Sequence, residues 1–416
     1  MWVLNFRWLE VKRALLLILL WNFAGAYELS FAQFVTLVEK NSIDLIKNKA
    51  QFDADLQDQR ANMSWGVSSV ESEVSMGKSA GGGMGVDSSA MFVLSPRLPW
   101  VTSMLKQSLQ TRTLQYQKNY DLLKNLTIIG AKRVYFSYLL TKEKFEIYKQ
   151  KERNFFSQLN IAEAKFRSGS VSKRDYVNFK TSYYDAKAAR VQTQKQLMDL
   201  EAVLAKMLGT GLKDSEVKVL DLQFGYLDIK QEKLKEMIAT SPYVEILDLN
   251  AKAHGINAKA SSYERWDSVS IGAGFQNSTA DAISQNQGTI RLQVPIPLTG
   301  KYDHLKKKFL VLQSAALREG EVTKHNVEMQ ALSYHKQLQI KREYIDVHKE
   351  SIDNKKALME MGKVAYESQK ISLFEYLAYQ NAYMDALINM TEAKMEYIQT
   401  QTFLEETLGV VLGKGK

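Results

Sequence analysis

The chain has 416 residues, of which 45% are hydrophobic, a normal proportion for a folded protein. Its formal net charge of +9 is mild for this length, and the basic residues are spread along predicted helical faces, so nucleic acid is not expected as a partner. Cysteine is absent, which excludes disulfides, thiolate metal ligands and cysteine nucleophiles. Only five prolines occur, so very long helices can form without interruption.

Residues 1–26 predict a secretory signal peptide. Arg7, Lys12 and Arg13 precede the apolar run ALLLILLWNFAGA, which ends in a small-residue cleavage site. The run is shorter than the ~20 residues of a membrane-spanning helix; an uncleaved N-terminal anchor is the alternative interpretation. No later segment is apolar enough for a transmembrane helix, so only strands could cross a membrane.

The next segments predict a helix over 30–65 and a β-hairpin over about 66–98. The hairpin strands are Val67–Met76 and Met91–Leu98, where the alternation of apolar and polar residues is rough. Between them lies a glycine-rich loop, GKSAGGGMGVDSS. We expect the chain to reverse at this loop.

A long helix and a return helix follow the first hairpin. Residues 101 to about 168 contain no proline and one glycine, and at 1.5 Å per residue they make a rod of about 100 Å. After a polar turn, the return helix 172–209 carries large apolar residues at coiled-coil spacing. They are Leu197, Leu200, Leu204 and Met207.

The second half repeats this order after a joining stretch, residues 209–228. Its hairpin covers about 267–297, and its apolar residues alternate with polar ones on both sides of a loop rich in Asn, Ser, Gln and Gly. A long helix covers about 302–368, and the return helix covers 372–409. The apolar stripe of this return helix is weaker and more polar, so we expect the helix to face partly toward water. The alternating hairpin residues are Val269, Ile271, Ala273 and Phe275, then Ile290, Leu292, Val294 and Ile296.

The two halves are copies of one pattern at an offset of 200 residues. FRSGSVSKRDYVNF (166–179) aligns with YESQKISLFEYLAY (366–379), and the alignment continues without a gap to Gly209 and Gly409. The sequence therefore predicts two structural repeats, 27–228 and 229–416.

No pattern in the sequence predicts catalysis. None of the five histidines pairs with another at a spacing of three or four, so no helical metal site is indicated. The glycines at 81–85 do not open a helix, which argues against a phosphate-binding loop. We therefore expect no enzyme activity, no catalytic residue, no metal site and no cofactor.

The chain resembles the TolC-type outer-membrane efflux proteins (outer membrane factors) over nearly all of residues 27–416. LSFAQFVTLVEKNS (29–42) is similar to the opening helix of that family, and the two hairpins match its four strands per protomer. The turns at Gly169 and Gln369 look like its G-x-[VI]-[ST] turn, which an acidic residue follows. The order, spacing and duplication of these features carry the resemblance.

The resemblance implies a mostly α-helical fold with a membrane β-barrel. Three protomers would close a twelve-stranded barrel in the outer membrane of a Gram-negative bacterium, continued by a coiled-coil helical tunnel in the periplasm. The residues independently favour oligomerisation, because two hairpins leave edges that lipid does not tolerate and four strands cannot close a barrel alone.

The implied function is that of a passive exit duct in a tripartite efflux system. A periplasmic membrane-fusion adaptor and an inner-membrane pump would deliver the substrate, whether drug, metal ion or protein, and the outer-membrane lipid would surround the barrel. One alternative is the exit duct of a type I protein secretion system. Another, of a different class, is a periplasmic coiled-coil adaptor or scaffold.

The resemblance also implies that the adaptor docks on both turns. These turns are equally well explained as ordinary helix reversals with serine N-caps and an acidic residue completing a capping box. The docking residues implied are Ser168, Gly169, Ser170, Val171 and Ser172, with Ser368, Gln369, Lys370, Ile371 and Ser372.

Two further sites follow from the same resemblance. Asp175 and Glu375 would form a cation-favouring ring at the periplasmic aperture, unless they are solvated helix caps. Ile371 stands where some family members have an arginine, so an arginine latch is not implied. In the barrel, Val269, Ile271 and Phe275 would face lipid, and Ser268, Ser270, Arg291 and Gln293 would face the lumen.

Overall fold

The structure is a computed structural model that describes residues 30–78, 84–209, 225–265, 269–280, 283–294, 296 and 299–412. The predicted signal peptide, most of the joining stretch and Ser268 lie outside these residues. The chain forms two compact units. The turn unit comprises Met1–Ile43, Leu123–Met237 and Glu328–Lys416, and the strand unit comprises Asp44–Leu122 and Ile238–Val327.

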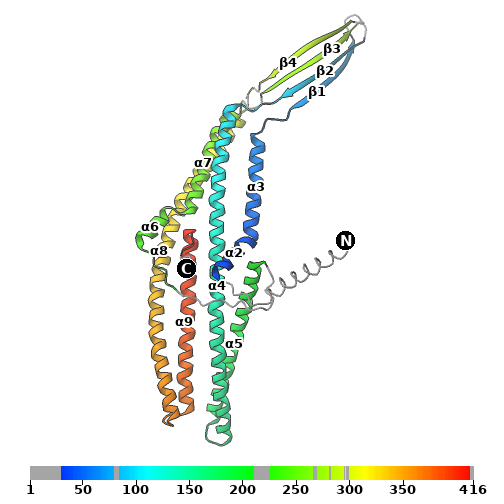
Figure 1. The fold of residues 1–416 in the computed structure, drawn as a ribbon. Helices are drawn as coiled ribbons and strands as arrows, with labels where there is room; N and C mark the ends of the chain where they lie inside the picture. The colour runs from blue at the N-terminus through cyan, green and yellow to red at the C-terminus, as the bar shows by residue number, and fades with distance from the viewer. Residues whose placement is uncertain are drawn as a thin grey trace, which may run out of the picture. The chain divides into compact units, whose positions relative to one another are not determined.

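The strand unit contains one antiparallel sheet with the strand order β1-β2-β3-β4 (Figure 1). Each half of the chain supplies one hairpin, and β2 joins them by pairing with β3, for example Phe92 with Ala273. The strands are β1 Ser69–Lys78, β2 Met84–Leu94, β3 Ser270–Ala280 and β4 Ile283–Gln293.

β2, β3 and β4 are longer than the sequence predicted, whereas β1 has the predicted length but lies two residues further along the chain, and both predicted loops were too long. β1 and β2 enter the glycine-rich segment, and β3 and β4 include most of the polar one. The main-chain ladder does not depend on apolar side chains, and polar side chains pair across it. Asn277, for instance, donates to the Asn286 side chain at 2.7 Å.

Helices provide most of the chain. The longest are α4 with 69 residues and α8 with 67, which correspond to about 100 Å each at 1.5 Å per residue. The predicted mostly helical fold with four strands is confirmed. The helix bounds are α2 Phe31–Asn41, α3 Ile43–Met63, α4 Pro99–Arg167, α5 Lys173–Leu208, α6 Gln231–Ala239, α7 Pro242–Glu264, α8 Lys301–Glu367 and α9 Leu373–Leu408.

The predicted opening helix 30–65 was wrong in one respect, because it is two helices. Ser42 is extended (φ −66°, ψ 113°) and separates α2 from α3. The Asn41 side chain just before it donates to the Leu208 carbonyl at the end of α5. A capping box between Ser30 and Gln33 starts α2. These contacts hold α2 on the turn unit.

The core of the turn unit forms where α2, α4 and α5 meet. Phe34 stacks on Tyr135 with ring centroids 5.3 Å apart, and Leu204 and Leu208 of α5 are buried beside them. Leu197, Leu200 and Met207 pack partly buried against the same cluster. The predicted apolar stripe of the first return helix therefore faces the core, as coiled-coil spacing requires.

The prediction that the polar stripe turns the second return helix partly toward water was wrong, because the stripe is buried. α9 buries many of its polar residues, among them Thr391, Gln401 and Thr402, whereas α5 buries few residues of any kind. The polar side chains are satisfied inside: Thr391 and Thr402 bond to main-chain carbonyls of their own helix, and Arg133 of α4 donates to Thr402 at 2.9 Å. A polar stripe here marks a hydrogen-bonded helix interface.

Candidate functional site

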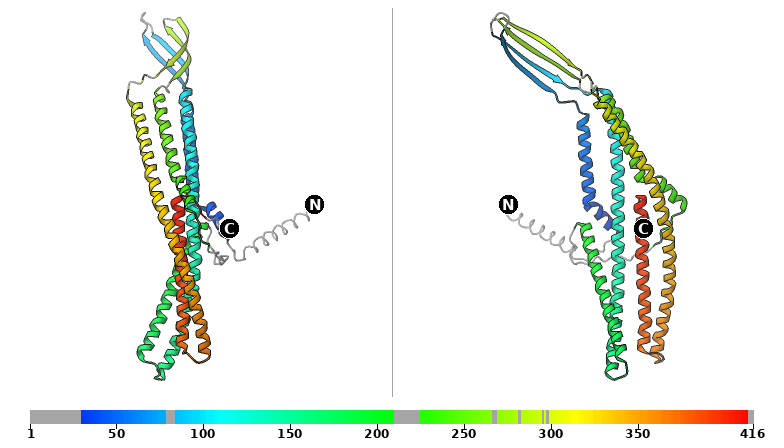
Figure 2. Two further views of the ribbon diagram at one scale, coloured as in Figure 1. Left: turned by 90° about the vertical axis from the view of Figure 1, so that its left-hand side faces the viewer. Right: turned by 180° about the vertical axis from the view of Figure 1, so that it is seen from behind.

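Both predicted turns lie at one end of the turn unit (Figures 1 and 2). They have the same backbone geometry. Gly169 adopts a left-handed φ of +75°, and Ser170 N–H bonds to the Lys165 carbonyl at 2.8 Å. Gln369 repeats this with φ +60°, and Lys370 N–H bonds to the Ala365 carbonyl at 2.8 Å. These are Schellman motifs, which usually place glycine at the left-handed position.

Serine starts each return helix, as the sequence predicted. The Ser172 hydroxyl accepts from Asp175 N–H at 3.1 Å, and the Ser372 hydroxyl accepts from Glu375 N–H at 3.2 Å. Among the described residues the reciprocal half of the capping box is absent at both turns. Asp175 instead accepts from the Ser172 hydroxyl at 2.7 Å, and Glu375 accepts from Tyr379 at 3.4 Å.

At each turn, one aromatic ring before the turn stacks on another ring after it. Phe166 stacks on Tyr176 with ring centroids 5.2 Å apart, and the equivalent Tyr366 stacks on Tyr376 at 5.7 Å. The residues predicted to dock a partner are exposed except Val171 and Ile371, which are half-buried. Each turn is thus a small, polar, rigid knob, a shape suited to contact with another protein.

A contact between the two helical hairpins was not foreseen from the sequence. Phe179 of α5 stacks on Phe374 of α9 with centroids 4.8 Å apart, and the Lys165 ammonium lies 4.9 Å from the Phe374 ring centre. The available signal was the difference between the copies, since the residue equivalent to Phe374 is Arg174. This stack joins the hairpins next to the turns.

The sheet has one apolar and one polar face. Ile271 and Phe275 share a face with Val70, Phe92 and Ile290, all of which are exposed. Ser270, Arg291 and Gln293 lie on the opposite face, where Arg291 also forms an ion pair with Glu71 at 2.7 Å. Exposed apolar area of this extent marks a contact surface for lipid or protein.

The interface of α4 with α9 contains a buried ion pair. Lys132 Nζ lies 2.7 Å from Glu405, and both side chains are almost inaccessible to solvent. Lys132 also donates to the Leu412 carbonyl, and Leu412 N–H donates to Glu405, each at 3.0 Å. Burial raises the pKa of Glu405, although the charge of Lys132 opposes this shift. The pair fixes the C-terminal segment on α4.

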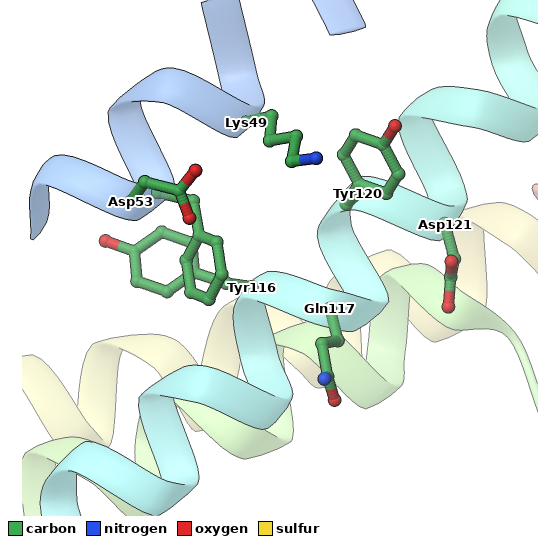
Figure 3. A pocket seen from close by; sticks show the side chains of 7 residues that line it. Lys49, Asp53, Tyr116, Gln117, Tyr120 and Asp121 are labelled. Atoms are coloured by element: carbon green, nitrogen blue, oxygen red, sulfur yellow. The ribbon is translucent and has the colours of Figure 1, made fainter. Parts of the chain in front are cut away.

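A cavity of about 380 Å³ lies between α3 and α4 in the strand unit (Figure 3). Tyr116 donates to Asp55 at 2.7 Å at its edge, and burial raises the pKa of Tyr116 to about 12. The charged residues of the wall are solvent-exposed, so no group here is set up for catalysis. The lining residues are Lys49, Phe52, Asp53, Tyr116, Gln117, Tyr120 and Asp121.

No described helix is both long and apolar enough to cross a membrane. Within the same residues, no group of three or more His, Asp or Glu side chains is arranged to hold a metal ion.

The fold is that of outer-membrane channel proteins. A membrane protein from Pseudomonas aeruginosa superposes with a TM-score of 0.73 at 15% identity over 93% of this chain and 91% of its own. CusC gives 0.72 at 13% identity over 92% of both chains. The Campylobacter jejuni outer membrane channel CmeC gives 0.71 at 13% identity over 93% of this chain and 87% of its own.

These neighbours identify the fold more closely as that of the TolC-type outer-membrane efflux proteins, so the predicted resemblance is confirmed at the level of fold. No protein-family model matches the sequence, and no curated protein matches it. CusC and CmeC are channels rather than enzymes.

Proposed function

We propose that this protein is a passive exit duct in the outer membrane of a Gram-negative bacterium. The sheet carries the proposal, because its exposed apolar face and polar opposite face suit lipid on one side and water on the other. β1 and β4 are open edges, which lipid does not tolerate. A homotrimer would pair these edges and close a barrel of about twelve strands.

The proposed partners are a periplasmic adaptor and an inner-membrane pump, together forming a tripartite efflux system. The two braced turns support this, since they offer exposed polar groups on a rigid frame. The helices would form the tunnel in the periplasm, and residues 1–26 would direct export. Selectivity would come from the width and wall charge of the tunnel.

Insertion and conductance test this proposal. In cells, the protein should be found in the outer-membrane fraction. After purification, it should conduct ions across planar lipid bilayers. Phe275→Arg places a charge on the lipid-facing side, at a cost of about 2–4 kcal/mol near the bilayer centre, and should abolish insertion.

The matched control is Gln276→Arg, which places the same charge on the opposite face and should insert and conduct. Equal insertion of both variants, or a wild-type protein that stays soluble and never conducts, would contradict the channel function.

A further inference from the structure

The first two turns of α8 expose four lysines, which we name the α8 basic cluster. Leu305 and Phe309 lie half-buried on the inner side of these turns, and the Phe309 ring stacks on His254 of α7 with centroids 6.2 Å apart. This contact fixes α8 on α7 and leaves the lysine side chains in contact with solvent. The cluster consists of Lys301, Lys306, Lys307 and Lys308.

The positive charge of the α8 basic cluster is not neutralised within the part of the chain that the structure describes. Asp303 is the one acidic residue between the first and the last lysine of the cluster, and it already pairs with Arg265 at 2.9 Å. Among the described residues, no other carboxylate lies within ion-pair distance of the four lysines. Cations near the N-terminus of a helix also oppose its dipole, so the cluster does not stabilise α8.

The exposed apolar face of the sheet continues almost to the cluster. On β4 and the residues after it, apolar side chains recur at every second position and are between 49% and 84% exposed. The last of them, Ile296, precedes Lys301 by five residues. At about 3.3 Å per residue these positions span roughly 20 Å, close to the apolar band of about 25 Å that outer-membrane barrels present to lipid. The residues are Ile290, Leu292, Val294 and Ile296.

Two exposed tryptophans lie at the same end of the sheet, where α4 and α8 begin (Figure 2). Trp65 precedes β1 and is 62% exposed, and the neighbouring Gly66 N–H bonds to the Ser95 carbonyl just after β2 at 2.9 Å. Trp100 lies in the first turn of α4 and is 50% exposed. Tryptophan is enriched where the apolar core of a membrane meets the headgroups, because its ring is apolar and its N–H is polar. This end of the sheet therefore has the side chains of a membrane–water boundary.

We infer that the α8 basic cluster binds anionic phospholipid headgroups in the membrane leaflet on the helical side of the sheet. Lysine ammonium groups bind phosphate as point charges and donate hydrogen bonds to its oxygens. From Lys301 to Lys308 the cluster spans about 10 Å along α8, which is comparable with a headgroup layer of roughly 5–8 Å. The inference rests on the proposed function, under which this leaflet faces the periplasm, and it names the class of lipid bound there.

The contact should depend on the charge of the lipid. One lysine beside an anionic membrane surface strengthens binding about fivefold. Lys306, Lys307 and Lys308 together should therefore favour an anionic over a zwitterionic phospholipid by at least about tenfold. Phosphatidylglycerol and phosphatidylcholine with the same acyl chains differ in net charge, so their relative binding reports this preference.

Native mass spectrometry of the purified protein, in detergent micelles with equal amounts of the two lipids, tests the inference. The wild type should retain phosphatidylglycerol in preference to phosphatidylcholine. The variant Lys306→Gln/Lys307→Gln/Lys308→Gln should lose at least about tenfold of this preference, because it removes three positive charges from the cluster. Arginine at the same three positions keeps the charge and should bind as the wild type does.

A matched control removes the same charge from the other end of α8. Lys349→Gln/Lys355→Gln/Lys356→Gln changes three lysines of this helix that lie in the turn unit, far from the sheet. The control variant should retain the preference of the wild type for phosphatidylglycerol.

Planar-bilayer recordings of the same proteins separate the lipid site from the channel function. A wild type that inserts and conducts but shows no preference for phosphatidylglycerol, or a glutamine variant of the cluster that keeps the preference, would overturn the lipid site alone. An equal loss in the control variant would show attraction by net charge only and would also overturn the site. A wild type that neither inserts nor conducts would overturn the channel function and the lipid site with it.

Discussion

Removing one partner of the buried pair Lys132–Glu405 should destabilise the turn unit strongly. Both side chains are at most 4% exposed, and Glu405 accepts from Lys132 at 2.7 Å and from Leu412 N–H at 3.0 Å. Lys132→Met leaves a buried carboxylate without its counter-charge, which typically costs about 3–5 kcal/mol. We expect a loss of this size in the free energy of unfolding at pH 8, measured by guanidinium denaturation and circular dichroism.

The loss should be smaller at low pH. Burial already raises the pKa of Glu405, and Lys132 is the largest influence that lowers it, so Lys132→Met raises the pKa further. A carboxyl group with a raised folded-state pKa contributes stability below its unfolded pKa and loses that contribution as pH rises through the folded pKa. The variant should therefore be less impaired at pH 5 than at pH 8.

The double variant Lys132→Met/Glu405→Leu provides the control. Replacing the whole pair by apolar residues is often close to neutral, so most of the lost stability should return. A double variant as unstable as Lys132→Met, or a loss that is the same at pH 5 and pH 8, would refute the explanation by an uncompensated buried charge.

Three further perturbations follow from the structure. Gln369→Gly should raise the free energy of unfolding by about 1 kcal/mol, and Gly169→Ala should lower it by about 1 kcal/mol, because glycine adopts positive φ with the least strain. Thermal melts in which Gln369→Gly destabilises the protein, or Gly169→Ala stabilises it, would contradict this explanation. Burial, together with the charge of Arg112, lowers the pKa of His254. The free energy of unfolding should therefore fall as the pH drops from about 7 to 5, and denaturation curves of His254→Phe should show a weaker pH dependence. Glu375→Gln should reduce cation selectivity in planar bilayers if Glu375 lines the aperture, and unchanged reversal potentials would exclude it.

The turns could be predicted from the sequence because their causes are local. A left-handed residue and a serine cap act within a few residues of the chain. The left-handed residue recurs at Gly169 and Gln369, and the cap recurs at Ser172 and Ser372. The leucine stripe of the first return helix was also readable, since a repeat of three and four residues fixes one face of a helix.

The features that were missed depend on partners far away in the chain. The polar stripe of α9 is buried because Lys132 and Arg133, about 270 residues earlier, supply its hydrogen bonds. The residues near Glu405 in the sequence do not indicate that these distant donors will contact it. The contact between Phe179 and Phe374 likewise joins opposite halves of the chain. The long strands were missed because main-chain pairing extends through residues with no apolar alternation.

The two main-chain hydrogen bonds of Leu412 show how far a C-terminal truncation can go without disturbing the buried ion pair. α9 ends at Leu408, yet both the N–H and the carbonyl of Leu412 are used by buried charged groups. A truncation at the end of the helix would remove a donor from Glu405 and an acceptor from Lys132 while leaving every helix intact. A shortened protein should therefore keep residues up to Leu412, and an affinity tag belongs after that position.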